Sequence, residues 1–454
     1  MNFNDIPKEV ISVLDVFEKN KFEIAIVGGA VRNLIIDHKV KDWDFATNAT
    51  PEQILKMFDG FYDNAFGTVR VKVGDSFYEI TTYRSESGFS DSRRPDKVVW
   101  GKSLADDLSR RDFTVNAMAI LRKNDQFELI DPFDGKNDLK NKIIRSVGNA
   151  NDRFIEDGLR VIRAIRFAIQ LNFKIEKDTF GALTEQRFIL LKIANERIRD
   201  EFLKIALSCN SYDHFMLLWD SKVIEIILPE LAKCFGVEQK SPNRHHNYDV
   251  WKHNVMSMIM CPSDDCIVKF AALIHDIGKP LVADITEEGV RTFYNHDIVG
   301  GQIAKQICAR WNMSKIDTTR IYKLVRWHLF SVNEFQTDKA IRRFIRNIGE
   351  ENIQDIIDVR TGDRLGSGST RESWRLKKFR ERLVEVNKTN FEIKDLKVNG
   401  LDVMEIFNIK PGPNIRKVLE VVFEKVDSDE LKNERDVLLD YLNQLRSSNF
   451  LGQN

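Results

Sequence analysis

Several features common in membrane and secreted proteins are missing from this sequence. It has no run of about 18 apolar residues, the length that a membrane-spanning helix needs. The first residues, MNFNDIPKEV, contain no basic stretch followed by an apolar one and so do not resemble a secretory signal. The chain has five cysteines and no CxxC spacing, which is typical of proteins in a reducing compartment. We therefore expect a cytoplasmic protein with no membrane contact and no disulfide partner.

The chain also carries no excess of either charge, because 69 basic and 69 acidic side chains cancel. Proteins that coat nucleic acid usually have a basic surplus, so any contact with RNA must use local clusters of charge. Hydrophobic residues make up 43% and charged residues 30%, as in soluble proteins with hydrophobic cores. Repeats and low-complexity tracts are absent from the sequence, and its length allows about two to four domains.

Strand signals are confined to the first third of the chain. Short apolar or alternating segments predict strands at 22–27, 69–73, 78–84 and 118–121, and a short helix is expected at 30–37. Further along, apolar residues recur at helical spacing, as in GLRVIRAIRFAIQ. The sequence therefore predicts an α+β fold, in which a head with a mixed or antiparallel sheet and helices precedes an elongated all-α body.

A first candidate site combines a Gly-Gly turn with two nearby aspartates. Gly28 and Gly29 end a predicted strand, and Asp42-Trp43-Asp44 comes after the next helix. Residues i and i+2 of a strand point to one side, so the two aspartates would present their carboxylates together, and such pairs repel unless a cation lies between them. Mg²⁺ prefers oxygen ligands and phosphates, and two such ions can activate a hydroxyl and stabilise departing pyrophosphate. Each motif alone is common by chance, whereas their order along the chain is more specific.

The segment GGAVRNLIIDHKVKDWDFAT resembles the active-site motif of the class II tRNA nucleotidyltransferases, the CCA-adding enzymes, whose superfamily includes bacterial poly(A) polymerases. Four further segments match that family in order: RRDFTVNAMA at 110–119, DPFDG at 131–135, EDGLRVIRAIRF at 156–167 and ERIRDEF at 196–202. The resemblance covers essentially the whole chain. It implies a nucleotidyltransferase head at 1–150, a helical neck at 151–235, an HD metal-binding domain at 236–365 and a helical, tRNA-binding tail at 366–454.

The resemblance assigns roles to residues of the head. Asp42 and Asp44 match the aspartates that hold the catalytic Mg²⁺ ions. The positions that match nucleotide-contacting residues are Gly29, Arg32 and Arg111 for the phosphates and Asp112 for the ribose. Glu79, near the start of YEITTYR, is a weaker candidate for a third carboxylate, since a strand glutamate commonly just points into solvent.

Four charged residues follow at three-residue intervals in the neck: Asp157, Arg160, Arg163 and Arg166. This spacing places them along one slowly winding stripe of a helix, and a basic solvent face is the commoner meaning of such a pattern. The resemblance instead implies a protein template for the incoming base. A carboxylate accepts and a guanidinium donates hydrogen bonds, so Asp157 and Arg160 together would accept cytosine or adenine and reject guanine or uracil. Arg163 and Arg166 would reach phosphates or hold the template in place.

Two further segments bear on substrate choice. Residues 84–103 are polar and rich in Gly and Ser, which predicts a mobile loop. This segment resembles the loop with which CCA-adding enzymes switch from C to A, and it favours full CCA addition while A-only addition stays open. Residues 395–445 resemble the C-terminal tail of the family, with Arg416 where relatives often have Gly after PGPxI.

A second candidate site is marked by histidine, since six of the eight histidines fall between residues 245 and 328. Their order with nearby aspartates resembles that of the HD phosphohydrolases, in a form able to hold two metal ions. The ligands that this resemblance implies are His253, His275, Asp276, His296, His328 and Asp363. Imidazole and carboxylate suit Mn²⁺, Ni²⁺, Fe²⁺ or Zn²⁺, and a metal-bound hydroxide could attack a phosphoester. His245 and His246 lie outside this pattern and receive no metal role.

These observations predict an enzyme that adds CCA to the 3′ end of tRNA from CTP and ATP without a nucleic-acid template. Its cofactor would be Mg²⁺, with a divalent transition metal and accessory phosphohydrolase activity at the HD site. The alternatives are an A-adding enzyme, a poly(A) polymerase, a protein that is mainly an HD phosphohydrolase, and a non-catalytic RNA-binding protein. Neutral charge, the HD ligands and the tail favour the tRNA enzyme. The identity of the HD metal and the choice between monomer and homodimer stay open.

Overall fold

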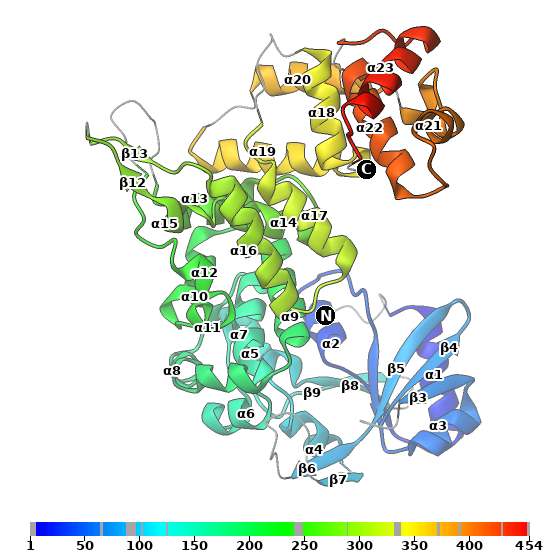
Figure 1. Cartoon of the computed structure of the whole chain (residues 1–454). Coiled ribbons are helices and arrows are strands. Elements are labelled where there is room, and N and C mark those ends of the chain that lie inside the picture. The colour runs from blue at the N-terminus through cyan, green and yellow to red at the C-terminus, as the bar shows by residue number, and fades with distance from the viewer. Residues whose placement is uncertain are drawn as a thin grey trace. The chain divides into compact units, whose positions relative to one another are not determined.

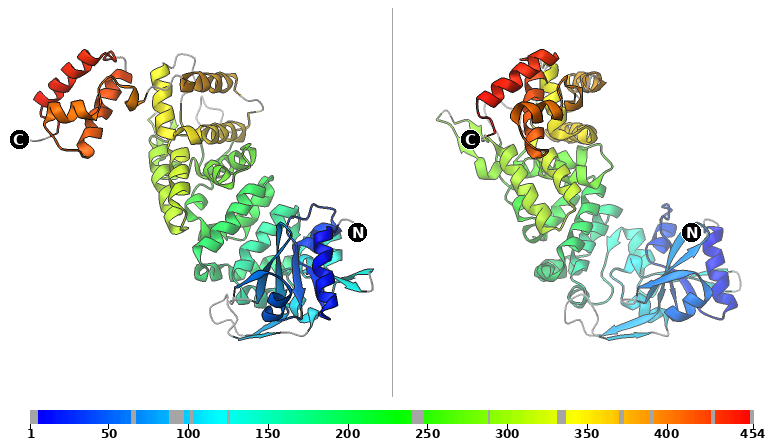
Figure 2. Two further views of the ribbon diagram at one scale, coloured as in Figure 1. Left: turned by 90° about the vertical axis from the view of Figure 1, so that its right-hand side faces the viewer. Right: turned by 45° about the vertical axis from the view of Figure 1, so that its right-hand side comes forward.

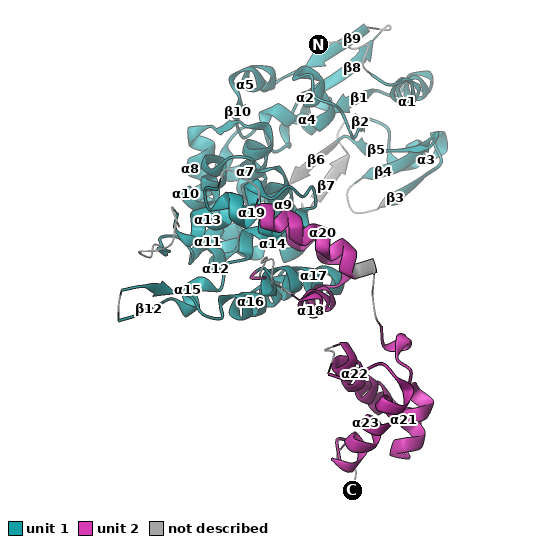
Figure 3. Ribbon diagram, turned by 90° about the horizontal axis from the view of Figure 1, so that it is seen from above, with its two compact units in different colours: residues 1–328, 358–369 teal, residues 329–357, 370–454 magenta. Residues whose placement is uncertain are grey.

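The computed structural model describes residues 6–63, 67–87, 97–100, 103–123, 126–239, 248–287, 289–330, 337–369, 373–388, 392–427 and 430–451. Figure 1 labels its helices and strands. The chain divides into two compact units: unit 1 comprises Met1–His328 and Asp358–Ser369, and unit 2 comprises Leu329–Ile357 and Thr370–Asn454 (Figure 3). No helix within the described ranges is long and apolar enough to cross a membrane.

The head of unit 1 is built around a sheet, drawn in blue to cyan in Figure 2. Its seven strands follow the order β3-β4-β5-β2-β1-β8-β9. Its strands are β1 (Ile24–Val27), β2 (Asp44–Thr47), β3 (Gly60–Asp63), β4 (Thr68–Val73), β5 (Ser76–Thr82), β8 (Ala119–Lys123) and β9 (Gln126–Ile130). Only β2 and β5 are parallel neighbours within this sheet. The four strands predicted from the sequence are confirmed as β1, β4, β5 and β8, so the sheet is mixed but mostly antiparallel.

The two faces of the sheet are covered differently. One face carries Ile26, Phe45 and Ile80, which share a core with α1 (Lys8–Lys19), α2 (Gly29–Ile35) and α3 (Pro51–Met57). The opposite face carries Val27 and Ala46, which form a smaller cluster with leucines of α4 (Leu104–Ser109). Burial alternates along β4 and β5, as expected where one face of a strand packs on a core and the other meets solvent.

Helices make up most of the rest of unit 1. They are α5 (Gly135–Asn141), α6 (Ala150–Glu156), α7 (Leu159–Leu171), α8 (Lys177–Gln186), α9 (Asn195–Ser208), α10 (Tyr212–Asp220), α11 (Ile224–Ile227), α12 (Pro229–Ala232), α13 (Val250–Met260), α14 (Cys266–Ile274), α15 (Lys279–Val282), α16 (His296–Arg310) and α17 (Lys315–Arg326), with 3₁₀ turns at Thr114–Asn116 and Arg187–Lys192. Short strand pairs join β6 (Arg84–Ser87) to β7 (Lys97–Trp100), β10 (Ile143–Ile144) to β11 (Lys174–Ile175) and β12 (Asp284–Ile285) to β13 (Arg291–Thr292).

One hydrophobic core runs from the head into these helices, because buried residues of the sheet, α7, α9 and α14 belong to the same cluster. At the junction, the ring of Phe167 on α7 meets that of Phe113 edge-on, with centroids 5.7 Å apart. The head, the neck and the predicted metal-binding segment therefore fold as one unit. The four-segment division of the sequence stays a prediction.

Unit 2 is helical in its described part. Its helices are α18 (Asp338–Ile348), α20 (Trp374–Lys388), α21 (Gly400–Phe407), α22 (Pro413–Asp427) and α23 (Arg435–Ser447), with 3₁₀ turns at Glu350–Asn352 and Ile393–Asp395. The helix α19 (Ile353–Gly366) begins in unit 2 and ends in unit 1. The α+β fold class predicted from the sequence is confirmed, with the sheet in the head and helices beyond it.

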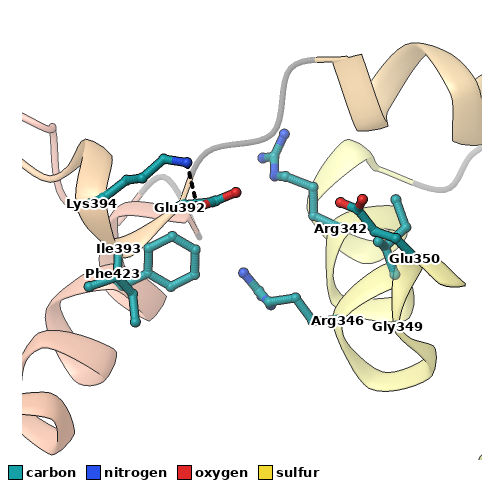
Figure 4. A pocket seen from close by; sticks show the side chains of 9 residues that line it. Arg342, Arg346, Gly349, Glu350, Glu392, Ile393, Lys394 and Phe423 are labelled. Atoms are coloured by element: carbon teal, nitrogen blue, oxygen red, sulfur yellow. Dashed lines mark ion pairs between the residues drawn. The ribbon is translucent and has the colours of Figure 1, made fainter.

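A pocket of about 410 Å³ in unit 2 is lined by basic, acidic and aromatic side chains (Figure 4). Its Arg342 and Arg346 pair with Asp427 at 2.7 and 2.9 Å. Its Lys394 pairs with Glu392 at 2.9 Å. These cations already have carboxylate partners, so the pocket offers no clear preference for an anion, and we assign no ligand to it.

Candidate active site and a second polar centre

Asp44 lies near the middle of the sheet, as the first residue of β2. It pairs with Val27 of β1 on one side and with Glu79 of β5 on the other. Asp42 lies two residues before β2 begins, so the expected placement of both aspartates on one strand holds for Asp44 only. The charge of Asp42 nevertheless acts on Asp44 and raises its pKa. The three carboxylates therefore form one electrostatically coupled group at the start of β2.

The environment of Asp44 disfavours its negative charge. Its pKa is raised first by the protein atoms that surround the carboxyl group and then by the charges of Glu79 and Asp42, while Arg111 opposes this shift. The residue as a whole is still exposed to solvent. A carboxylate that is crowded by like charges and accessible from solvent suits a divalent cation, because the cation removes the repulsion. Glu79, a weak candidate in the sequence, lies beside Asp44 in this arrangement.

The Gly-Gly turn brings the backbone against this group. Gly28 has φ +71°, a conformation that L side chains rarely adopt. A side-chain carbon at Gly28 would lie 3.0 Å from Nη1 of Arg111 and 3.9 Å from Oδ2 of Asp44. The turn, the guanidinium and the carboxylate therefore lie side by side, although they are far apart in the sequence. Gly29, the residue chosen from the sequence, begins α2, and a carbon added there would lie 3.5 Å from Nη2 of Arg32.

Arg111 is held in place by a buried carboxylate that was not predicted from the sequence. Its Nη2 donates to Oδ2 of Asp107 at 3.1 Å, and Arg110 donates to Oδ1 of the same aspartate. Burial of Asp107 favours a higher pKa, but the charges of Arg111 and Arg110 outweigh this and lower it. The carboxylate is therefore ionised and fixes both arginines of the RRDF motif. Asp107 lies three and four positions before the two arginines, a spacing at which side chains on a helix meet. This spacing could have indicated the contact from the sequence.

Asp112 links the head to the neck. Arg163 of α7 donates to Oδ2 of Asp112 from Nε at 2.9 Å and from Nη2 at 2.5 Å. Oδ1 of Asp112 accepts from the side chain of Asn116, whose own oxygen accepts from Nη1 of Arg32 at 2.6 Å. Asp112, the predicted ribose contact, thus belongs to one hydrogen-bonded chain with Arg32 and Arg163. Arg32 was predicted to contact phosphates, and Arg163 to reach phosphates or hold the template. The side chain of Asn116 is the central member of this hydrogen-bonded chain and was missed in the sequence.

We expect Asp112→Asn to lower the free energy of unfolding of unit 1 by about 2 kcal/mol at pH 7. Although burial favours a higher value, Arg163 and Asn116 lower the pKa of Asp112 to about 2. A carboxyl group whose pKa is lower in the folded state stabilises fully above its unfolded pKa near 4, and this stability is lost as pH falls toward 2. Urea denaturation at several pH values measures the difference, which should shrink between pH 4 and pH 2.

Asp106, on helix α4, provides the control, because it is exposed to solvent. Asp106→Asn should leave stability nearly unchanged at every pH. A constant difference between Asp112→Asn and the original chain across this pH range would contradict the assignment of the low pKa to this ion pair.

The first two residues of the predicted template lie at the join of α6 and α7. Oδ1 of Asp157 accepts from the backbone of Leu159 at 3.1 Å, and Oδ2 lies 3.6 Å from Nη2 of Arg197. Arg160 donates from Nη2 to the backbone oxygen of Arg110 at 2.7 Å and from Nη1 to Glu156 at 2.9 Å. The polar groups of both side chains are therefore engaged with protein, and a base could pair with them only by replacing some of these contacts.

The other two arginines of the stripe meet one buried glutamate on α9. Nε of Arg166 lies 2.7 Å from Oε2 of Glu201, and Nη1 of Arg163 lies 4.0 Å from Oε1 of the same residue. Arg166 is 8% exposed, and its burial lowers its pKa to about 10. All three arginines of the stripe thus pair with carboxylates instead of forming a solvated basic face. That Arg163 and Arg166 reach phosphates or hold the template in place stays a prediction.

Arg197 and Glu201 explain why ERIRDEF accompanies the template segment. They lie four residues apart, so they share one face of α9, and that face meets Asp157 and the arginines of α7. The motif is visible in the sequence, but no role for its residues was predicted from it. Their spacing was the available signal, whereas their partners could be known only from the packing of α9 against α7.

The histidines and aspartates of the second candidate site come together in unit 1. The residues are His253 on α13, His275 and Asp276 after α14, His296 at the start of α16, His328 after α17 and Asp363 on α19. Within the described residues, two groups have ligand atoms within 4.8 Å of one another: His253, His275 and Asp363, and His275, Asp276 and His328. Nε2 of His296 lies 3.1 Å from Oδ1 of Asp276. All six side chains selected from the sequence are thus neighbours.

The histidine rings are oriented by hydrogen bonds from their other nitrogen. Nδ1 of His275, His296 and His328 donates to the carbonyls of Ala272, Phe293 and Val325 at 2.8, 2.7 and 2.7 Å. Because a carbonyl can only accept, a neutral ring then carries its lone pair on Nε2, which faces the centre. Nε2 of His296 and of His328 are buried without a well-aligned hydrogen bond. This is the arrangement expected of metal ligands.

Charge in this centre is balanced by close contacts. Burial alone would raise the pKa of Asp276, but Lys279 and His275 bring it well below its usual range. Burial would also lower the pKa of His253, yet its hydrogen bonds to Asp276 and Asp363 raise it to about 9. Nζ of Lys279 contacts Asp276 directly and donates to Gln239 at 2.6 Å. The proton on His253 and the ammonium of Lys279 thus neutralise the carboxylates of Asp276 and Asp363. The same carboxylates could instead bind a metal cation.

A close backbone contact lets the segments of this centre meet. A side-chain carbon at Gly278 would lie 2.2 Å from the backbone oxygen of His296 and 2.7 Å from the nitrogen of Gly300. Only glycine permits the turn after α14 to lie this close to the start of α16. The loop predicted at 84–103 lies partly outside the described residues, since 88–96, 101 and 102 are not described, and His245 and His246 lie wholly outside them.

Comparison with known proteins identifies the family to which the chain belongs. A family model described as "Poly A polymerase head domain" matches residues 24–145, "Probable RNA and SrmB- binding site of polymerase A" matches 172–235, and a model for tRNA nucleotidyltransferase domain 2 matches 293–442. A CCA-adding enzyme of Lactococcus lactis subsp. cremoris is 32% identical over 452 residues, which cover 97% of both chains. The chain belongs to the family of CCA-adding tRNA nucleotidyltransferases. The resemblance to the CCA-adding enzymes noted in the sequence is therefore confirmed, and the chain is an enzyme of the nucleotidyltransferase class.

Other members of the CCA-adding family agree in extent and fold. A CCA-adding enzyme of Pediococcus pentosaceus is 32% identical over 440 residues, 96% of this chain and 97% of the relative. The crystal structure of the Bacillus stearothermophilus CCA-adding enzyme in complex with CTP superposes with a TM-score of 0.70 at 22% identity, covering 98% of this chain and 99% of that one. The Thermotoga maritima CCA-adding enzyme complexed with tRNA gives 0.56 at 20% identity, covering 97% and 96%. These structural similarities show that the chain shares the fold of these enzymes.

Proposed function

We propose that this member of the CCA-adding family adds C, C and A in turn to the 3′ end of tRNA, using CTP and ATP and releasing pyrophosphate. The observation that carries the proposal is the meeting of Asp44, Glu79, Arg111 and the Gly28 turn on one face of the sheet. Solved relatives have been described in complex with CTP, with ATP and with tRNA, which supports these substrates.

Asp42 and Asp44 would hold the catalytic Mg²⁺ ions. Their carboxylates fit such ions, because the surrounding protein atoms, and then repulsion by Glu79, raise the pKa of Asp44 while the residue is still open to solvent. When bound, divalent cations activate an attacking hydroxyl and stabilise the charge on the leaving pyrophosphate. The protein contributes the guanidinium of Arg111 beside Asp44, and Gly28 lets the backbone approach phosphate oxygens closely.

Base selection would fall to Asp157 and Arg160. Cytosine and adenine both present an amino donor beside a ring-nitrogen acceptor, which matches a carboxylate beside a guanidinium. Guanine and uracil present the opposite pattern and would leave buried polar groups unpaired. The contacts of Asp157 with Arg197, and of Arg160 with Glu156, hold the two side chains in place until a base replaces part of them.

We expect Asp157→Ala to reduce the preference for CTP over UTP by about 10²-fold in kcat/KM, since a hydrogen bond to a charged group is lost. Single-nucleotide addition to tRNA that ends at the discriminator base, with each triphosphate supplied alone, measures this. Asp152→Ala, an exposed aspartate on the preceding helix α6, is the control and should keep the preference. An Asp157→Ala enzyme that still discriminates as well as the original chain would disprove the template role.

The same assay separates full CCA addition from A-only addition. Purified protein is incubated with tRNA ending at the discriminator base, at CC and at CCA, with CTP and ATP supplied separately and then together. Addition of C, C and A followed by a stop supports the proposal. Extension only of tRNA ending in CC would indicate an A-adding enzyme, and long A tails on any RNA would indicate a poly(A) polymerase.

We further propose that the second centre is a metal-dependent phosphohydrolase, because its six side chains converge and two of its imidazole nitrogens are buried without aligned partners. The donor set of imidazoles and carboxylates fits Mn²⁺, Ni²⁺, Fe²⁺ or Zn²⁺. A metal there would supply a hydroxide for attack on phosphorus. Lys279, beside Asp276, adds positive charge that would stabilise an anionic phosphoester. Candidate substrates are 2′,3′-cyclic phosphates, 2′-nucleotides and 3′ phosphates at a damaged tRNA end.

A further inference from the structure

The row of side chains that contains Asp44 and Glu79 continues across two more strands, β4 and β3. Glu79 on β5 pairs with Arg70 on β4, and Arg70 pairs with Phe61 on β3. Residues paired across neighbouring strands place their side chains on the same face of a sheet. Phe61, Arg70 and Glu79 therefore share the face of Asp44, in one line from the edge of the sheet to its centre.

A second aromatic residue and a second cation lie one step along the same face. Phe77 on β5 pairs with Lys72 on β4, and each lies two residues from a member of the first row. The guanidinium of Arg70 lies over the ring of Phe77, 4.7 Å from its centroid. Phe61 is 73% exposed and Phe77 is 57% exposed. We call Phe61, Arg70, Lys72 and Phe77 the β-face patch.

The β-face patch has no evident role in folding. The core of the head lies on the opposite face of the same strands, where Val69, Val71 and Ile80 are fully buried. Two solvent-exposed phenyl rings on neighbouring parts of a sheet contribute little to that core, and polar residues would serve equally well. Aromatic rings combined with arginine and lysine are instead typical of surfaces that bind single-stranded nucleic acid, by stacking on bases and by contacting phosphates.

The position of the β-face patch relative to Asp44 indicates which substrate it would bind. Gly28 and Arg111 approach Asp44 from the side of β1, whereas the β-face patch lies on the side of β5. Because neighbouring strands are about 4.8 Å apart, β4 lies about 10 Å from β2. A nucleotide whose triphosphate is near Arg111 would thus leave the other side of Asp44 for the acceptor strand.

We propose that the β-face patch binds the single-stranded 3′ end of the acceptor RNA, with a base stacked on Phe77 and phosphates near Arg70 and Lys72. This placement brings the terminal hydroxyl toward Asp44 from the side opposite the triphosphate. The inference rests on the proposed nucleotidyl transfer and adds to it the location of the second substrate. The patch acts by position and charge and takes no part in bond making.

The test uses the full chain and the variants Phe77→Ala and Arg70→Ala. We expect Phe77→Ala to raise KM for tRNA that ends at the discriminator base about tenfold, because one stacking contact is lost, with KM for CTP unchanged. Arg70→Ala should raise the same KM and make it less dependent on salt. The controls are Leu55→Ala and Lys56→Ala, exposed residues of α3, which packs on the opposite side of β3 and β4. Both should leave KM for tRNA unchanged.

A binding measurement separates failure of this inference from failure of the proposed transfer. RNA that ends in 4-thiouridine is photo-crosslinked to the inactive Asp44→Asn protein, and the modified peptides are identified by mass spectrometry. Cross-links within residues 60–63 or 68–82 support the β-face patch even if no nucleotide were added by the original chain. Cross-links confined to other segments, an unchanged KM for tRNA in Phe77→Ala, or an equal rise of KM for CTP would overturn it.

Discussion

Asp44→Asn is expected to lower kcat for addition of C to tRNA by about 10³-fold, which corresponds to several kcal/mol of lost transition-state stabilisation. Asp44 is the carboxylate at the centre of the sheet that meets both Glu79 and Arg111. An amide at this position still accepts hydrogen bonds but no longer supplies the charge that a divalent cation requires. Single-turnover assays at saturating Mg²⁺, tRNA and CTP measure the chemical step directly.

This variant should fold as well as the original chain or slightly better. The pKa of Asp44 is raised by burial of its carboxyl and by Glu79 and Asp42, so the folded protein pays a repulsion that a neutral side chain removes. Thermal unfolding distinguishes a chemical defect from a folding defect. Asp75→Asn, an exposed position in the turn between β4 and β5, is the matched control and should retain full activity. If Asp44→Asn adds nucleotides at the original rate, the nucleotidyltransferase site lies elsewhere.

The second large effect is expected at the histidine centre. His275→Ala should abolish retention of a divalent transition metal and lower hydrolysis of 2′,3′-cyclic phosphates by more than about 100-fold, since even residues that only support a metal ligand change affinity or activity by 10- to 100-fold. His275 belongs to both groups of converging ligand atoms, so its loss affects each of them. Metal content after dialysis, measured by mass spectrometry, and phosphate release measure the two consequences separately.

Nucleotide addition should be unaffected in His275→Ala, just as the hydrolase activity should survive Asp44→Asn. The control is His214→Ala on α10, a histidine outside the centre, which should retain the metal. Equal metal content in His275→Ala and the original chain would show that the centre does not bind a metal through these ligands. Loss of both activities in one variant would instead indicate a folding defect in unit 1.

Much of the head could be predicted because its signals are local. β1, β4, β5 and β8 are apolar or alternating segments, and the strand periodicity identifies them without knowledge of the rest of the chain. The start of β2 was less predictable. Asp42 and Asp44 have the spacing of one strand face, yet the strand begins at Asp44, because only there does the chain pair with β1 and β5.

The arginine stripe shows the limit of a helical pattern. Spacing placed Arg160, Arg163 and Arg166 on one face of α7, and this pattern alone favoured a solvated basic surface. In the structure these arginines meet Glu156, Asp112 and Glu201, so they are ordered by ion pairs. The partners lie on α6, in the head and on α9, and a local pattern contains no information about which helices pack together.

The sequence by itself determined the order of the motifs, the family, the α+β fold class and the residue types available to each site, because these depend on local spacing and composition. Only the tertiary structure decided which of these residues meet. It placed Glu79 and Arg111 at Asp44, brought histidines from four separate segments to one centre, and aligned Phe61 and Arg70 with the carboxylates. These contacts arise from strand order and helix packing, which depend on burial of surfaces far apart in the chain and not on any short segment.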